Sequence, residues 1–250
     1  MTSLLTILTA ILALAFAGTA LAFARGSTHA SRLIWVCWAG SIVLFIVNTL
    51  LAKAPPFGNM RHVFCFFPMA LVPAWLYLHR VQRINLGSYM AGAASIALIG
   101  ALCMPMQATW RQMPALQSPW FVPHVTAYII SYGLNTVAFL LALRSYRSSQ
   151  AEQRLHEADA VTYLAFPFMV FGLCSGAIWA NDAWGRYWAW DIKEVWSLIT
   201  CLVYLLYFHT SRHLPDWRRP LLILGFIAIL ITFLVVNLLP KISSVHSYAT

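Results

Sequence analysis

The sequence predicts an all-α, polytopic integral membrane protein, and three observations lead to that fold class. Hydrophobic residues make up 61% of the 250 positions. Charged residues make up only 9%, whereas soluble domains carry roughly 25%. The apolar residues also fall in long runs, each close to the roughly 20 helical residues that cross a hydrocarbon core about 30 Å thick.

Eight such runs follow one another along the chain, so we expect about eight transmembrane helices. They lie near residues 3–24, 33–52, 63–79, 86–106, 124–143, 161–180, 193–209 and 220–240. The first run has no positively charged start and exceeds the usual 7–15-residue core of a signal peptide, so we expect it to be a retained span. No segment is left for a soluble domain, and residues 1–250 are expected to form a single membrane domain.

The basic residues indicate how these helices are oriented. An eight-span topology places the loops near 25–32, 80–85, 144–160 and 210–219 on one side, and these loops hold ten of the 16 Lys and Arg residues. Because cytoplasmic loops are enriched in Lys and Arg, we expect both termini to lie on the outer face. The net charge of +9 is scattered over the loops, so it does not indicate a nucleic-acid-binding surface.

The cysteines do not suggest redox or thiolate chemistry. All five lie within or beside apolar runs, and none forms Cys-x-x-Cys. They are therefore expected to be buried small hydrophobic residues. The chain also lacks Cys-x-x-Cys-His, so it carries no c-type haem of its own.

One short segment differs from the rest of the chain. Residues 184–194 read WGRYWAWDIKE, which combines three tryptophans, a tyrosine and several charged residues. Part of this pattern has a structural explanation, because Trp and Tyr gather at membrane interfaces and Asp191 with Glu194 forms a capping-box pattern at a helix start. The density of Trp184, Trp188 and Trp190 goes further, and it suggests a stacking platform for a large flat ligand such as a porphyrin.

This segment lies in an external loop that we expect over residues 181–194, and two histidines belong to the same predicted face as this loop. His124 begins the fifth run and His246 follows the eighth. Haem iron takes axial imidazoles, so these two residues are candidate ligands, and Arg186, Lys193 or Arg61 would suit the propionates. At the inner ends lie His79 and His209. Since His209 is 18 residues after Asp191, about 27 Å separates them along a helix, nearly the depth of the hydrocarbon core.

These segments resemble the tryptophan-rich WWD superfamily of haem-handling proteins. The signature is Trp184 to Glu194. Further similarity lies in PHVTAYIISYG (123–133), VYLLYFHTSRH (203–213) and NLLPKISSVHSY (237–248). With APPFGNM (54–60), they favour the CcsA (ResC-like) branch of system II cytochrome c biogenesis. The resemblance covers about residues 50 to 250.

The resemblance implies a function and a set of site residues. It implies a cytochrome c haem lyase (synthase) in the bacterial cytoplasmic membrane, active only with a CcsB (ResB-like) subunit. Non-covalent b-type haem is its substrate and apocytochrome c the acceptor, kept reduced by a thiol-reducing thioredoxin-like protein. Membrane lipid surrounds it and no nucleic acid binds. His124 and His246 would hold the iron, His209 would serve an inner haem site, and the macrocycle would rest on Trp184, Trp188, Trp190 and Asp191, with Arg186 nearby.

Two positions depart from the family pattern, and three other readings stay open. Ile192 stands where the family usually has Pro, and His62 stands where an acidic residue is expected. One alternative is a carrier that delivers haem to a chaperone, as in the CcmC branch, and a related one is a regulatory family member that binds no apocytochrome. Another is a b-type electron-transfer subunit with His79 and His209 as inner ligands. The third is a scaffold in which the aromatic segment is only an interfacial belt and a helix cap.

Overall fold

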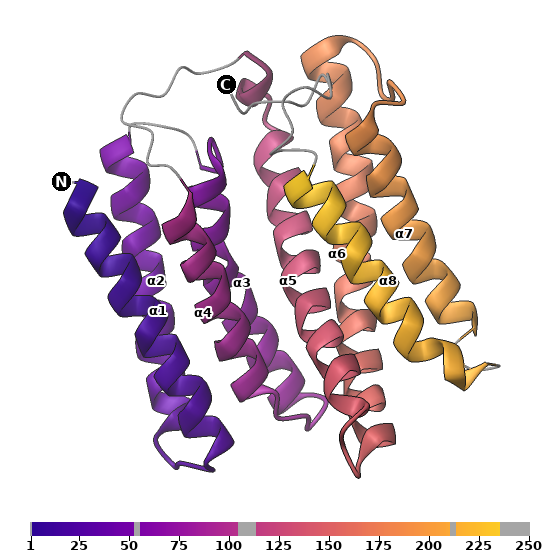
Figure 1. Ribbon diagram of the computed structural model, residues 1–250. Coiled ribbons are helices and arrows are strands. Elements are labelled where there is room, and N and C mark those ends of the chain that lie inside the picture. Colours follow the sequence, from indigo (N-terminus) through magenta and orange to yellow (C-terminus); the bar gives the residue numbers. More distant parts are fainter. Residues whose placement is uncertain (1, 53–55, 105–113, 211–213, 236–250) are drawn as a thin grey trace. The chain divides into compact units, whose positions relative to one another are not determined.

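The predicted all-α membrane fold is confirmed. The computed structural model describes residues 2–52, 56–104, 114–210 and 214–235, and these residues form helices and turns without any strand. The chain divides into two compact units, residues 1–117 and 118–250, and each is described here by itself (Figure 1).

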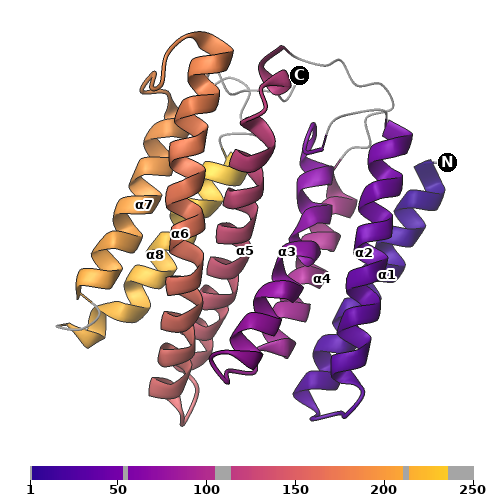
Figure 2. The same cartoon turned by 180° about the vertical axis from the view of Figure 1, so that it is seen from behind.

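Unit 1 is a bundle of four helices. Each helix packs against the next along the chain, and the first contacts the fourth, which closes the bundle (Figures 1 and 2). The helices are α1 (Thr2–Ala24), α2 (Ala30–Ala52), α3 (Met60–Arg80) and α4 (Gly87–Cys103), and a short 3-10 turn, η1 (Pro114–Gln117), follows.

Small residues and hydrogen bonds to backbone carbonyls hold unit 1 together. The buried face of α4 includes several alanines, and small side chains let neighbouring helices approach closely in a membrane. Ser95 Oγ donates to the carbonyl of Ala13 at 2.9 Å, and Trp38 Nε1 donates to that of Met69 at 3.1 Å. These bonds link α4 to α1 and α2 to α3, and they satisfy polar groups that would be costly to bury unpaired.

Unit 2 is also a closed four-helix bundle. Its helices again pack in chain order, and the first contacts the fourth. The elements are α5 (Phe121–Ser145), α6 (Ala151–Trp184), α7 (Ile192–Thr210), the 3-10 turn η2 (Pro215–Trp217), α8 (Arg218–Leu230) and the π-helical segment η3 (Ile231–Val235). The start of α5 and the end of α6 lie at the same end of this unit in both views (Figures 1 and 2).

Six of the described helices are long and apolar enough to cross a membrane, and all six fall on predicted spans. They are α1, α2, α3, α5, α6 and α7. The other two predicted spans correspond to shorter helices, α4 with 17 residues and α8 with 13 residues. The number of crossings and the outward orientation of the termini therefore stay predictions.

Helix α6 is longer than the apolar run predicts. The run covers 161–180, whereas the helix covers Ala151–Trp184 and has 34 residues. At 1.5 Å per residue it is about 51 Å long, more than a hydrocarbon core needs. Its first ten residues, AEQRLHEADA, are mostly good helix formers, and Arg154 and Glu157 pair at 2.8 Å. Residues 151–160, expected in a loop, thus extend the helix.

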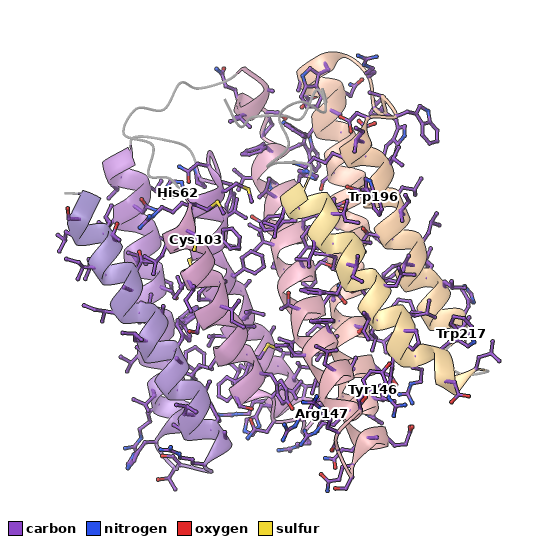
Figure 3. All side chains as sticks on the ribbon, viewed as in Figure 1. His62, Cys103, Tyr146, Arg147, Trp196 and Trp217 are labelled. Atoms are coloured by element: carbon purple, nitrogen blue, oxygen red, sulfur yellow. The ribbon has the colours of Figure 1, made fainter. Side chains whose placement is uncertain are left out.

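An ionic network joins three helices of unit 2 at the end opposite the 185–191 loop. Arg218, at the start of α8, contacts Asp159 at 2.6 Å and Glu152 at 2.9 Å, both on α6. The hydroxyl of Tyr207 on α7 donates to the other oxygen of Asp159. The Arg218 side chain is only 10% exposed, so these partners offset the free-energy cost of burying its charge. Figure 3 shows Tyr146 and Trp217 at this end of the unit.

Replacing the central arginine is expected to loosen α8. Arg218→Ala removes charged hydrogen bonds that are typically worth about 1.5–3 kcal/mol each, and it leaves the Asp159 carboxylate without its cation. Thermal unfolding of the protein in detergent should show a clear drop in Tm. Arg147→Ala is the matched control, because that side chain is exposed at the same end of the unit (Figure 3). An equal drop in both variants would contradict an anchoring role.

Candidate functional site

The tryptophan-rich segment contains the turn between α6 and α7, which covers residues 185–191, and the ends of the loop expected over 181–194 belong to the two helices. Helix α6 ends at Trp184, and Gly185 caps it: its backbone is left-handed (φ +74°) and its N–H donates to the carbonyl of Asn181 at 2.8 Å. Glycine takes this conformation without the steric cost that a Cβ brings. The chain can therefore turn directly after Trp184, which keeps the aromatic segment short and close to the helix ends.

The start of α7 has the predicted capping box. The N–H of Glu194 donates to Asp191 Oδ1 at 2.8 Å, and the N–H of Asp191 donates to Glu194 Oε2 at 3.3 Å. The same Glu194 oxygen accepts a second bond, from the N–H of Ala189 at 2.7 Å. Glu194 is buried, so its carboxylate ties the turn to the first turn of α7. Helix α7 begins at Ile192, the position where the family usually has Pro.

This carboxylate determines how Trp190 is presented. Glu194 binds the N–H groups on both sides of Trp190, and Trp190 lies between them with a left-handed backbone (φ +59°). Such a conformation costs a non-glycine residue roughly 1–2 kcal/mol, and it is kept because the surrounding hydrogen bonds require it. The Trp190 side chain is 72% exposed. The turn thus holds a large apolar ring outward at a cost in backbone strain.

The rings of this turn form an aromatic surface. Trp188 and Trp190 meet edge to face, with ring centroids 5.9 Å apart, and Tyr187 is 61% exposed. Trp188 is half-buried, and no described residue accepts a hydrogen bond from its buried Nε1. Trp120, at the start of α5, is also exposed. Unsatisfied buried donors and clustered exposed rings are both features of ligand-binding surfaces.

A chain of ring contacts leads from the turn to His124. Trp184 meets Trp179 edge to face at 4.9 Å, and the Trp179 ring stacks on the His124 imidazole at 5.5 Å with an interplanar angle of 19°. Phe121 packs on Trp179 from α5 at 5.6 Å. The predicted proximity of His124 to the tryptophan-rich turn is therefore observed in unit 2, with Trp179 between them.

His124 is held by both α5 and α6. Its Nδ1 lies 2.8 Å from the carbonyl oxygen of Gly172 on α6. The ring of Tyr128, one turn along α5, meets the imidazole edge to face at 5.1 Å. The histidine is half-buried. An imidazole held by a carbonyl and by two aromatic rings has little rotational freedom, as a ligand of a metal usually does.

The remaining predicted site residues of unit 2 are placed as follows. Arg186 is exposed in the turn, and Lys193 lies in the first turn of α7. His209 lies in the last turn of α7, at the other end of that helix, and is exposed. His246 and Trp110 lie outside the described residues. Within the described part of the chain, His, Cys, Asp and Glu side chains do not gather in groups of three or more that would hold a metal ion.

The candidate histidines of unit 1 are part of its packing. His62 is 1% exposed and its ring lies 5.9 Å from that of Phe45; Figure 3 shows it near the start of α3. His79 stacks on Trp75 at 5.5 Å and 6°. Arg61, considered for the propionates, is buried, and its Nη2 is 3.4 Å from Thr6 Oγ1. Each of these three side chains thus contacts other residues of unit 1.

Sequence reasoning missed the α6 side of the site. Trp179, Gly172 and Gly176 contact or closely approach His124, yet only the turn that follows α6 was considered. A signal was present, because two glycines four residues apart lie on the same face of a helix and such pairs permit close helix contact. The pairing of this face with His124, 48 residues earlier in the chain, is not visible from spacing alone.

The sequence profile of one protein family matches most of the chain. Its description is "Cytochrome C assembly protein", and the match covers residues 26–243. The chain belongs to this family. The membership assigns it to the assembly of c-type cytochromes and implies an involvement of haem.

Individual relatives agree with that membership. The chain is 31% identical to a "Cytochrome c biogenesis protein CcsA" of Guillardia theta over 232 residues, covering 77% of this chain and 76% of the relative. It is 31% identical to the protein of that name from Prochlorococcus marinus (strain NATL2A) over 242 residues, with the same coverages. The protein of that name from Chlamydomonas reinhardtii is 39% identical over 159 residues, or 57% of this chain and 44% of the relative. The resemblance to the CcsA branch is thereby confirmed.

Removing the Glu194 carboxylate should destabilise the turn. Glu194→Ala removes the acceptor of two backbone N–H groups, those of Ala189 and Asp191, and it is expected to cost about 1.5–3 kcal/mol. Asp191→Ala removes one cap acceptor and is expected to cost about 0.5–2 kcal/mol. The checks are Tm and the rate of protease cleavage within residues 185–191. Glu194→Gln retains one acceptor oxygen and should fall between wild type and Glu194→Ala; a Tm drop in Glu194→Ala no larger than in Asp191→Ala contradicts the assignment.

Proposed function

We propose that this protein is the haem-handling subunit of a cytochrome c synthase. It holds haem at the external face of the membrane and presents it to the Cys-x-x-Cys-His segment of an apocytochrome c. It works in the bacterial cytoplasmic membrane as a multi-pass protein together with a CcsB-like subunit. The observation that carries the proposal is the contact chain from the tryptophan-rich turn through Trp179 to a firmly held His124.

The geometry of unit 2 suits a flat ligand with a central iron. The exposed ring of Trp190, the neighbouring Trp188 and the half-buried Trp184 offer apolar stacking area, and aromatic faces favour such contact. Arg186 is exposed in the same turn and suits a propionate. In the proposal His124 supplies one axial imidazole and His246, outside the described residues, supplies the second.

The described residues then contribute positioning and not covalent chemistry. When an apocytochrome thiol adds across a haem vinyl group, a carbon–sulfur bond forms and the proton goes to the other vinyl carbon. The reaction needs no nucleophile from this chain, so its barrier is lowered by holding the two partners in register. The His124 imidazole and the tryptophan rings would fix the height and plane of the haem while the acceptor approaches.

The inner site of the proposal is consistent with the surface of α7. His209 is exposed, whereas Tyr207, two residues earlier, is fully buried and bonded to Asp159. Two residues correspond to about 200° around a helix, so the two side chains lie on nearly opposite faces. The buried tyrosine fixes the rotation of α7 about its axis, and His209 is left exposed on the surface of unit 2. An exposed histidine at this end of α7 suits a haem ligand pair completed by a partner subunit.

The proposal differs measurably from its rivals. An electron-transfer subunit predicts two tightly held, redox-active haems in the isolated chain, and a scaffold predicts none. A carrier of the CcmC type predicts haem binding without thioether formation. The synthase predicts labile haem at the outer site and covalent cytochrome only when the partner subunit is present.

Replacing an outer ligand should weaken haem retention in a way that imidazole repairs. His124→Gly and His246→Gly are each expected to lower the haem content of the purified protein, because one axial bond is lost. Added imidazole should restore both the haem absorption spectrum and the yield of cytochrome c. His62→Gly is the control, since that buried histidine belongs to unit 1. Unchanged haem content and cytochrome yield in both variants would overturn the ligand role.

Replacing His209 should separate the inner site from the outer one. His209→Ala is expected to reduce the haem content and cytochrome yield of the complex with the partner subunit, while the isolated chain keeps its spectrum. The comparison uses absorption spectra of both preparations. If the isolated chain loses as much haem as the complex, His209 does not act with the partner.

A further inference from the structure

The carbonyl group that holds His124 also determines which ring nitrogen carries the proton. A carbonyl oxygen only accepts hydrogen bonds, so the 2.8 Å contact between Gly172 O and Nδ1 requires the proton on Nδ1. In a neutral imidazole the lone pair is then on Nε2. A ligating histidine usually has this arrangement, in which the nitrogen remote from the metal donates to a backbone or carboxylate oxygen.

The imidazole has room for this bond only because residue 176 is glycine. A Cβ at position 176 would lie 2.6 Å from both Cε1 and Nδ1 of His124, closer than real side-chain contacts allow. The ring cannot easily retreat, because Trp179 covers it at 5.5 Å and Tyr128 meets it at 5.1 Å. These two rings leave one position for the imidazole, directly against the backbone of α6 at Gly172 and Gly176.

We infer that Gly172 and Gly176 are positioning residues of the haem site. They fix the tautomer and the position of the His124 ring so that Nε2 faces the iron. The inference rests on the proposed function, in which His124 is an axial ligand. It adds a role for α6 that the tryptophan-rich turn does not cover. Gly172 acts through its carbonyl oxygen, and Gly176 acts through the absence of a side chain.

Gly176→Ala tests whether the glycine determines the position of the His124 ring. The added methyl group should displace the imidazole from Gly172 and weaken haem binding about 10–100-fold, as loss of a ligand's supporting bond does at metal sites. Haem titration followed by absorption is the measurement, and imidazole should restore the bis-imidazole spectrum because the displaced ligand is replaced from solution. Wild-type affinity in this variant would overturn the inference.

Two other glycines provide matched controls. Gly225→Ala would bring a Cβ within 2.7 Å of Tyr204 Cζ on α7, so it perturbs packing in unit 2 away from His124. It should lower Tm without any response of the haem spectrum to imidazole. Gly92→Ala, in α4, meets no atom within 4 Å and should change nothing. If Gly176→Ala and Gly225→Ala behave alike, Gly176 is only a packing residue.

The tautomer can be measured without haem. In the haem-free protein with 15N-labelled histidine, the His124 resonances, assigned with His124→Gln, should be those of a ring protonated at Nδ1. Protonation at Nε2 would overturn the inference, even if Gly176→Ala fails to fold. The two proposals fail separately: unchanged haem binding in His124→Gly removes the ligand role itself, whereas haem loss in His124→Gly with normal binding in Gly176→Ala removes only the positioning role.

Discussion

The close approach of α5 to α6 at Gly172 and Gly176 is the constraint on which the His124 end of unit 2 depends. A side chain at either position would clash with a residue of α5. A Cβ at Gly172 would lie 3.0 Å from the Tyr128 ring, and one at Gly176 would lie 2.6 Å from the His124 ring. Because both positions are bare, the His124 imidazole reaches the α6 backbone and Trp179 covers it. In an apolar environment such close packing is a main source of helix association.

The tryptophan-rich turn combines two explanations that the sequence offered as alternatives. The capping box is present, and Glu194 completes it. The same carboxylate holds the N–H groups on either side of Trp190, so the cap is also what presents the exposed ring. A structural role for Asp191 and Glu194 therefore does not compete with a ligand-binding role for the tryptophans. One hydrogen-bond arrangement supports both.

The two ends of unit 2 have different chemistry. At one end, aromatic rings surround a single imidazole; at the other, Arg218, Asp159, Glu152 and Tyr207 form an ionic network. Since α7 runs between them, the network fixes the rotation of the helix whose first turn carries the cap. The orientation of the exposed His209 follows from the same anchoring.

The sequence by itself determined the helical membrane class, the approximate position of each described α-helix, the cap at Asp191 and the family. These features are local, because long apolar runs, helix-start patterns and short motifs each consist of residues close together in the sequence. It also predicted that His124 lies near the tryptophan-rich turn, since helix order alone brings the two ends together.

Only the tertiary structure decided which α6 residues face His124, that Trp190 has a left-handed backbone, and that α6 extends over residues 151–160. The first depends on a contact between groups 48 residues apart in the chain. The second depends on the particular hydrogen bonds that the Glu194 carboxylate makes to the N–H groups on either side of Trp190. The third depends on helix propensity continuing beyond the apolar run, which hydropathy does not register. Packing between helices, and not the composition of any one of them, set the geometry of the site.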